Sequence, residues 1–232
     1  MLVTLDKVLG PEELAQARRL LAAVQWGSGL DTAGAQSALV KNNQQVPETA
    51  AQLPALRQLV LEALARSAPF MTAALPLKIL PPLFNRYAGQ SNAFGYHVDG
   101  AMRRMPGGVA GGTPEYVRAD VSATLFLSEP DEYDGGVLTI DDTFGRHGVK
   151  LPAGSMVVYP SSSLHEVTPV TRGARVSCFL FLQSMVRDAG QRRLLYDMDM
   201  ALLQLRAAQG ESEPVIALTG TYHNLLRRWA EN

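Results

Sequence analysis

The first 77 residues show helical spacing of apolar positions on either side of a polar connection. Apolar residues over 2–9 predict a short strand, and Pro11 opens a helix through about Val24, because proline is favoured in the first helical turn. A polar stretch from Trp26 to Val46 precedes a second helix, expected from about Glu48 to Phe70. Its apolar face consists of Leu53, Leu56, Leu59, Val60 and Leu64. We expect these helices to brace a sheet.

From about Lys78 to Ser184 the pattern changes to short β-rich runs separated by Gly, Pro and Asp. This pattern predicts an antiparallel double-sheet barrel that carries the chemistry. The strand candidates are Ser122 to Leu127, Val137 to Ile140, Ser155 to Tyr159 and Leu164 to Val170. The segment RMPGGVAGGTPEY, from Arg104 to Tyr116, has four glycines and two prolines, so it is expected to be irregular. It is either a substrate lid or a loop without a role.

Helical spacing returns after Val186, and a last helix is expected near Tyr222 to Trp229. The apolar positions of the first of these helices are Leu194, Leu195, Met198, Leu202 and Leu205. The chain therefore divides into an N-terminal strand with supporting helices (1–77), a β core (78–186) and a C-terminal helical extension (187–232). The extension either caps the barrel or forms a subunit contact, so a homo-oligomer is one hypothesis.

Composition limits the partners of the chain. The sequence is 47% hydrophobic and 19% charged with a net charge of -1, so no basic surface for nucleic acid or a membrane is indicated, and a small or locally bound partner is expected. Cys178, the single cysteine, lies in the apolar run VSCFLFL; this excludes an intramolecular disulfide and a thiolate-rich zinc site and predicts a buried thiol. The start MLVTLDKVLGPEEL has no basic segment followed by a long apolar one, so a cytoplasmic enzyme is expected.

Two of the four histidines have the spacing of metal ligands. In FGYHVDG, His97 and Asp99 are two residues apart at an expected strand end, and the period of two turns both side chains to one face. His165, on another strand, would complete a set of two imidazoles and one carboxylate. Open-sited iron(II) oxygenases have this set, which leaves about three positions on the metal for a bidentate keto acid and oxygen. His147 and His223 are interpreted as structural or surface residues.

Arg175 is the candidate for binding an anion. It starts the run RVSCFLFLQ, which is expected to be a central, covered strand, where a charge needs a partner. If 171–173 form a three-residue hairpin loop, Val170 pairs with Ala174 and Arg175 faces the same side as His165. Four residues of strand span about 13 Å, which a five-carbon diacid and an extended arginine can bridge, so the guanidinium would bind the far carboxylate. A two-residue turn would separate the two faces, and a protein acid as the partner of Arg175 is the alternative.

Several segments together carry a resemblance to a known family: WGSGLDTAG, VKNNQQ, NRYAG before YHVD, SATLFLSEPDEYDGG, LHEVTPVTRGAR and the helical tail. With them the chain resembles the prolyl and lysyl hydroxylase type of iron(II)/2-oxoglutarate dioxygenase, in its bacterial branch associated with iron uptake. The resemblance implies an α+β fold with a double-stranded β-helix (jelly-roll) core. It also implies iron ligands His97, Asp99 and His165, a 2-oxoglutarate carboxylate ligand Arg175, a further cosubstrate contact Tyr87, and ascorbate as a candidate cofactor.

The activity implied by the resemblance is hydroxylation of a C–H bond with release of succinate and carbon dioxide. The implied substrates are a peptidyl proline or lysine, or a small metabolite connected with iron uptake. In the front segments, five residues either shape a substrate groove or serve packing: Trp26, Thr32, Gly34, Lys41 and Asn43.

Two other classes of protein would use the same ligands. A non-catalytic metal-binding jelly-roll sensor would keep them but would not need Arg175. A hydrolytic zinc enzyme would need a nearby acid such as Glu166 facing the metal, whereas on a strand Glu166 points away from His165.

Overall fold

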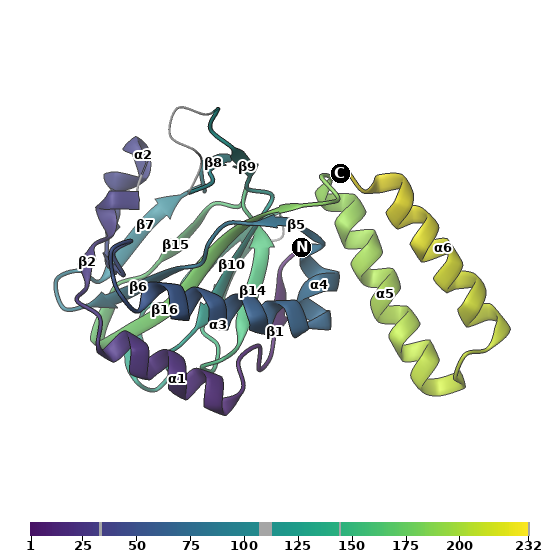
Figure 1. Ribbon diagram of the computed structural model, residues 1–232, viewed down its shortest axis with the longest axis horizontal. Helices are drawn as coiled ribbons and strands as arrows, with labels where there is room; N and C mark the ends of the chain where they lie inside the picture. Colours follow the sequence, from purple (N-terminus) through teal and green to yellow (C-terminus); the bar gives the residue numbers. More distant parts are fainter. Residues whose placement is uncertain (33, 107–112, 144, 232) are drawn as a thin grey trace.

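The computed structural model describes residues 1–32, 34–106, 113–143 and 145–231 (Figure 1). In this part of the chain two antiparallel sheets face each other, helices cover the outer side of the larger sheet, and a helical hairpin follows at the C-terminus. The structure confirms the expected α+β fold with a jelly-roll core.

The larger sheet holds the long central strand β16. In spatial order its path is β1 (Val3–Leu5), β14 (Met156–Pro160), β10 (Val121–Phe126), β16 (Val170–Ser184), β6 (Leu83–Ala88), β4 (Gln44–Gln45) and β2 (Gly27–Ser28). Two further strands, β5 (Pro76–Ile79) and β11 (Tyr133–Gly135), also pair with β16.

The smaller sheet faces the interior of the larger one. Its order is β13 (Gly145–Val149), β12 (Leu138–Asp142), β15 (His165–Val167), β7 (Ala93–His97) and β3 (Lys41–Asn42). A separate ribbon pairs β8 (Met102–Arg104) with β9 (Tyr116–Arg118). Of the expected lid, residues 107–112 lie outside the described residues.

The position of β16 in the middle of the larger sheet explains why its sequence is apolar without alternation. Cys178, Leu180 and Leu182 belong to the core between the larger sheet and the helices. Arg175 and Ser177, which have the opposite parity, line the cavity between the sheets. From Arg175 to Ser184 both faces of the strand are covered, and the expected buried thiol of Cys178 is confirmed.

The N-terminal helices are α1 (Pro11–Ala22), α3 (Leu53–Arg66) and α4 (Ala68–Ala74), with the short η1 (Gly29–Thr32) and α2 (Ala35–Ala38) in the polar connection. The single helix expected over 48–70 is wrong, because the chain forms two helices separated at Ser67. Ser67 is extended and its hydroxyl accepts the Phe70 N–H at 3.3 Å. Pro69 has no N–H to continue the first helix, but it fits the first turn of the second.

The hairpin expected over 171–173 is also wrong. β15 ends at Val167, and β16 starts at Val170 and runs straight through these residues. Gly173 does have a positive φ of 72°, but there it allows close approach to β11, since a Cβ would overlap the Glu132 carbonyl. Pro169 donates no hydrogen bond between the two strands, and the chain crosses there from the smaller to the larger sheet.

The C-terminal extension consists of α5 (Ala189–Gln209) and α6 (Glu213–Trp229), which stand beside the barrel as an antiparallel pair (Figure 1). The hairpin packs on α4, where Thr72 donates to Asp199 at 2.7 Å. Its apolar cluster consists of Leu75, Val186, Leu195, Leu202, Val215 and Tyr222. None of the described helices is long and apolar enough to cross a membrane.

Candidate active site

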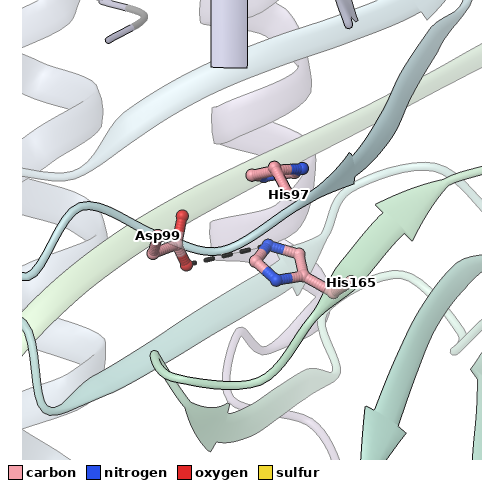
Figure 2. A group of neighbouring side chains, drawn as sticks. All are labelled: His97, Asp99 and His165. Carbon is pink, nitrogen blue, oxygen red and sulfur yellow. Dashed lines mark ion pairs between the residues drawn. The ribbon is translucent and has the colours of Figure 1, made fainter. Parts of the chain in front are cut away.

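Two neighbouring strands of the smaller sheet bring the predicted metal ligands together (Figure 2). His97 ends β7 and lies directly opposite His165 at the start of β15, with ring centroids 4.2 Å apart. Asp99 follows two residues later on the same side, and Val98 between them is exposed. One ligand atom from each of the three residues lies within 4.8 Å of the others. Asp99 lies beyond the end of β7, but the alternation continues through the exposed Val98, so His97 and Asp99 share one side as expected.

Each imidazole is held by a hydrogen bond at Nδ1, which leaves Nε2 directed toward the other two residues of the group. Nδ1 of His97 lies 2.8 Å from the Gly95 carbonyl, and Nδ1 of His165 lies 3.0 Å from the Ser163 carbonyl. A carbonyl only accepts hydrogen bonds, so in each ring Nδ1–H donates, and Nε2 is the nitrogen whose lone pair the neutral ring would offer to a metal. Burial, and then the neighbouring His165, lower the pKa of His97 to about 4, so this ring is neutral at physiological pH.

Asp99 is fixed from two sides. Ser122 of β10 donates its hydroxyl to Oδ2 at 2.7 Å, and Nη2 of Arg103 lies 3.7 Å from Oδ1. His165 Nε2 lies 3.7 Å from the same Oδ2. Two imidazole nitrogens with free lone pairs and one carboxylate form a donor set that fits ferrous iron, and the three residues come from one side of the cavity.

Arg175 lies on the opposite wall of the cavity, in the larger sheet. Its side chain is 1% exposed, and its Nη1 donates to the Ser177 hydroxyl at 2.7 Å. The guanidinium lies 5.2 Å from the ring centroid of Tyr87, its cross-strand neighbour on β6, and 5.1 Å from that of Phe126. Within the described residues Nε has no hydrogen-bond partner, and Arg175 makes no ion pair with a carboxylate. A buried cation of this kind calls for an anionic ligand.

One cavity of about 390 Å³ connects the two walls, and it is lined by His97, Asp99, His165, Arg175 and Tyr87. The expected link between His165 and Arg175 is therefore present, but it crosses from one sheet to the other and does not follow a hairpin. A volume of this size suits a small ligand, since such pockets typically measure about 300–1,000 Å³.

The front segment contributes to the same cavity. Thr32, Gly34, Lys41 and Asn43 line it, whereas Trp26 packs against the core between helices and sheet. Four of the five residues therefore line the cavity and Trp26 serves packing, and a role of these four in binding substrate stays a prediction.

Three other predictions about polar residues can be compared with the structure. Glu166 does not line the cavity, as the alternation along β15 predicted. His147 is exposed on β13, with Nε2 3.1 Å from Asp142, and His223 is exposed on α6. Both histidines are surface residues, as expected.

The sequence reasoning missed the residues that hold the ligands in place, chiefly Ser122, Arg103 and Ser177. Ser122 and Ser177 are polar positions within otherwise apolar strand segments, SATLFL and VSCFLFL, and such positions are the one signal that points to the interior. Arg103 has no such signal, because it lies on the short strand β8 between two exposed residues, and its contact with Asp99, four residues earlier, depends on how the chain turns between them.

Comparisons with protein families match most of the chain. The 2OG-Fe(II) oxygenase superfamily matches residues 82–183, and the PKHD-type hydroxylase C-terminal domain matches residues 189–231. A PKHD-type hydroxylase of Azoarcus sp. (strain BH72) is 67% identical over 232 residues, covering 100% of both chains. One of Nitrosomonas eutropha is 66% identical with the same coverage.

Solved structures with low sequence identity share the fold. A prolyl hydroxylase from Trichoplax adhaerens, in complex with a hypoxia inducible factor peptide fragment, has a TM-score of 0.51 and 13% identity, covering 83% of this chain and 86% of that one. The non-heme alpha ketoglutarate dependent epimerase SnoN from nogalamycin biosynthesis has a TM-score of 0.53 and 16% identity, with coverage of 80% and 78%.

Proposed function

The chain belongs to the PKHD-type hydroxylases, a family of 2-oxoglutarate- and iron(II)-dependent oxygenases, and we propose that His97, Asp99 and His165 hold its iron. The enzyme is a dioxygenase that hydroxylates its substrate, and the substrate is a peptide or a small molecule. Bound iron and 2-oxoglutarate supply oxygen activation, with 2-oxoglutarate leaving as succinate and carbon dioxide.

Each protein group has a distinct task in this proposal. The two Nδ1–H groups hold the imidazoles with Nε2 toward the metal, and Ser122 orients the carboxylate of Asp99. Phe94 stacks on the His97 ring at 3.5 Å and shields it from water. These contacts fix the ligands before metal binds, so little reorganisation is needed when it does.

Arg175 supplies the observation that carries the proposal. Its buried guanidinium has no carboxylate partner within the described residues and shares the cavity with the three ligands. We propose that it binds the far carboxylate of 2-oxoglutarate and that Tyr87, beside it, contacts the same cosubstrate. A non-catalytic metal sensor would have no use for this arginine.

Several finer points stay predictions. In the division into 1–77, 78–186 and 187–232, the second boundary is supported by the break between β16 and α5 and by the separate family matches. The first boundary falls within β5, and β1 to β4 pair into the two main sheets, so the first 77 residues share these sheets with the core. A peptidyl proline or lysine, or a small metabolite linked to iron uptake, stays the predicted substrate. The cytoplasmic location, the use of ascorbate and a homo-oligomer formed through the helical tail are also predictions.

Anaerobic titration of the metal-free protein tests the proposal. Ferrous iron followed by 2-oxoglutarate should give a visible metal-to-ligand charge-transfer band, because the keto acid must chelate the metal. His165→Ala should abolish the band, and His223→Ala, a surface histidine of the same chain, should leave it unchanged. A normal band in pure His165→Ala protein would contradict the ligand assignment.

A further inference from the structure

The segment KNNQQ closes one side of the cavity with a row of buried polar side chains. Lys41, Asn43 and Gln45 alternate along it and are 8%, 5% and 4% exposed. Lys41 pairs through its backbone with Phe94 in the smaller sheet, and Gln45 pairs with Asn85 in the larger sheet. The row therefore bridges the two sheets beside the metal ligands, with Lys41 and Asn43 lining the cavity.

Lys41 is a buried cation whose hydrogen-bond partners are neutral. Its Nζ donates to Thr32 Oγ1 at 2.9 Å and to Gln45 Oε1 at 3.0 Å. An ammonium has three donors, so one remains for a ligand. The same Nζ lies 5.5 Å from the ring centroid of Phe94, the residue stacked on His97, and so close to the metal ligands.

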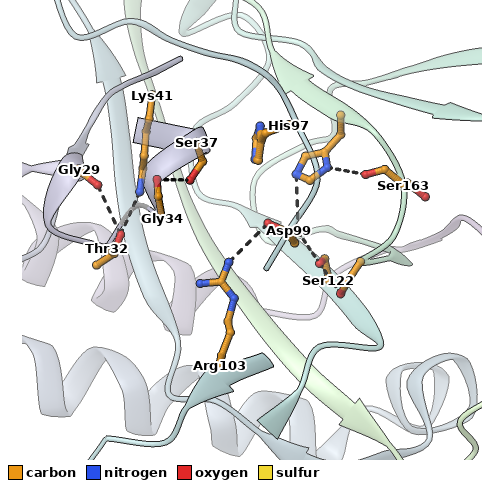
Figure 3. A network of polar contacts seen from close by, with 12 residues as sticks. Gly29, Thr32, Gly34, Ser37, Lys41, His97, Asp99, Arg103, Ser122 and Ser163 are labelled. Carbon is orange, nitrogen blue, oxygen red and sulfur yellow. Dashed lines mark hydrogen bonds and ion pairs between the residues drawn. The ribbon is translucent and has the colours of Figure 1, made fainter. Parts of the chain in front are cut away.

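Two more groups at this end of the cavity have unused hydrogen-bonding atoms. Neither amide atom of Asn43 meets the geometry of a hydrogen bond within the described residues, although Asn43 lies beside the Tyr87 phenol and tends to lower its pKa. Nε of Arg103 is also buried without a partner among the described residues. The Arg103 guanidinium lies 3.6 Å from the Phe181 ring centroid, so it is held in place. In Figure 3, Lys41 and Arg103 extend toward the same region, which Asp99 and His97 border.

The side chains that line the cavity have more positive than negative charges. Its described lining contains the cations Lys41, Arg103 and Arg175 but only one acid, Asp99. Binding ferrous iron and the 2-oxoglutarate dianion adds no net charge, so Asp99 can balance only one of the three cations. Asp31 is a second acid whose charge tends to raise the pKa of Lys41, but it is exposed and does not line the cavity. With iron and cosubstrate bound, two cations face the space left for the substrate.

We propose that the substrate carries a carboxylate, which Lys41, Arg103 and Asn43 bind next to the iron site. The inference rests on the proposed function, since it assigns to substrate the part of the cavity that 2-oxoglutarate does not fill. A carboxylate accepts several hydrogen bonds at once and would use the free donors of all three side chains. It would also bring one negative charge into a cavity with an excess of positive charge and so lower the cost of burying these cations. A small acid and the carboxylate of a peptide both have this chemistry.

Matched acids and amides test the proposal by calorimetry on the anaerobic protein loaded with ferrous iron and 2-oxoglutarate. One pair is N-benzoylglycine and its primary amide; the other is N-acetyl-trialanine and its C-terminal amide. In the wild type, at least one acid should bind about tenfold or more tightly than its amide, since a hydrogen bond to a charged group contributes about 1.5–3 kcal/mol. Preference within the first pair only indicates a small acid, and preference within the second only indicates a peptide carboxylate.

Lys41→Met should remove most of this preference while 2-oxoglutarate still binds within about threefold of wild type, and Lys41→Arg should restore part of it. Lys41→Gln replaces the methionine variant if that variant does not fold. Lys78→Met, which removes an exposed lysine of β5, is the matched control and should keep the preference.

Three results would overturn the proposal. The wild type could bind acids and amides equally, Lys41→Met could keep the preference, or Lys41→Met could weaken 2-oxoglutarate as much as the acids, which would place Lys41 in the cosubstrate site. A wild type that binds neither iron nor 2-oxoglutarate would instead remove the proposed function itself.

Discussion

Replacement of Arg175 by methionine separates the binding of 2-oxoglutarate from the binding of metal. The side chain is buried, donates through Nη1 to Ser177 and lies beside the Tyr133 phenol, while Nε has no partner among the described residues. It lies on β16, whereas His97 and His165 lie on β7 and β15 of the other sheet. Methionine keeps much of the volume, so the metal site should remain intact.

The size of the effect follows from the ion pair that is lost. Removing one partner of a buried, hydrogen-bonded charge pair costs about 2–5 kcal/mol, and about 1.4 kcal/mol is a tenfold change. The dissociation constant of 2-oxoglutarate should therefore rise about 30-fold or more, while that of iron should stay nearly unchanged. Without cosubstrate the guanidinium has no counter-ion, so the free energy of unfolding of the ligand-free variant should not fall by more than about 1 kcal/mol.

The assay is anaerobic titration of 2-oxoglutarate into the iron-loaded protein, followed through the charge-transfer band, with urea unfolding of the ligand-free protein in parallel. Pyruvate has the chelating keto acid without the far carboxylate, so its affinity should change far less. Arg175→Lys should restore only part of the 2-oxoglutarate affinity, because lysine lacks the planar fork. Arg172→Met is the control, since Arg172 is on the same strand but exposed and paired with Asp134.

Two results would refute this reasoning. If 2-oxoglutarate and pyruvate weaken equally, Arg175 does not contact the far carboxylate. If the ligand-free protein loses several kcal/mol of stability, Arg175 has a structural role that its contacts do not reveal.

Four further predictions concern the groups around the site. Asp99→Ala should remove most iron affinity in calorimetry, and Ser122→Ala should lower it by about tenfold, the smaller end of the usual effect of losing a hydrogen bond to a ligand. Gly136→Ala should weaken the binding of 2-oxoglutarate but not of iron in the band titration. At a backbone φ of 60° the added Cβ would lie 2.8 Å from Val170, 2.9 Å from Tyr133 and 3.1 Å from Arg175 Cδ, and so would displace the wall that holds the guanidinium. Equal weakening of both ligands would contradict this prediction. The free energy of unfolding of the metal-free protein, measured in urea, should fall as the pH is lowered from about 6.5 toward 4. In this window His97 takes up a proton in the unfolded chain but not in the folded protein, where its pKa is about 4. A free energy of unfolding that does not change with pH would contradict this cause.

The sequence alone determined the local features of this protein. The spacing of His97 and Asp99 placed both side chains on one face, because side-chain direction along a strand depends only on the chain itself. The apolar run of β16 likewise indicated a strand covered on both faces, since it has no polar side to turn to water. Helical spacing in the tail similarly predicted α5 and a last helix, although α6 starts well before the residue expected.

Only the tertiary structure decided which strands lie opposite each other. Gly173 was consistent with a hairpin, but its positive φ serves the contact between β16 and β11, and no local signal separates these two uses. Arg175 therefore reaches the site of His165 across the barrel, and Lys41 and Arg103 join it from distant segments. Strand partners depend on hydrogen bonds and packing between residues far apart in sequence, which the local pattern of hydrophobic and polar positions does not encode.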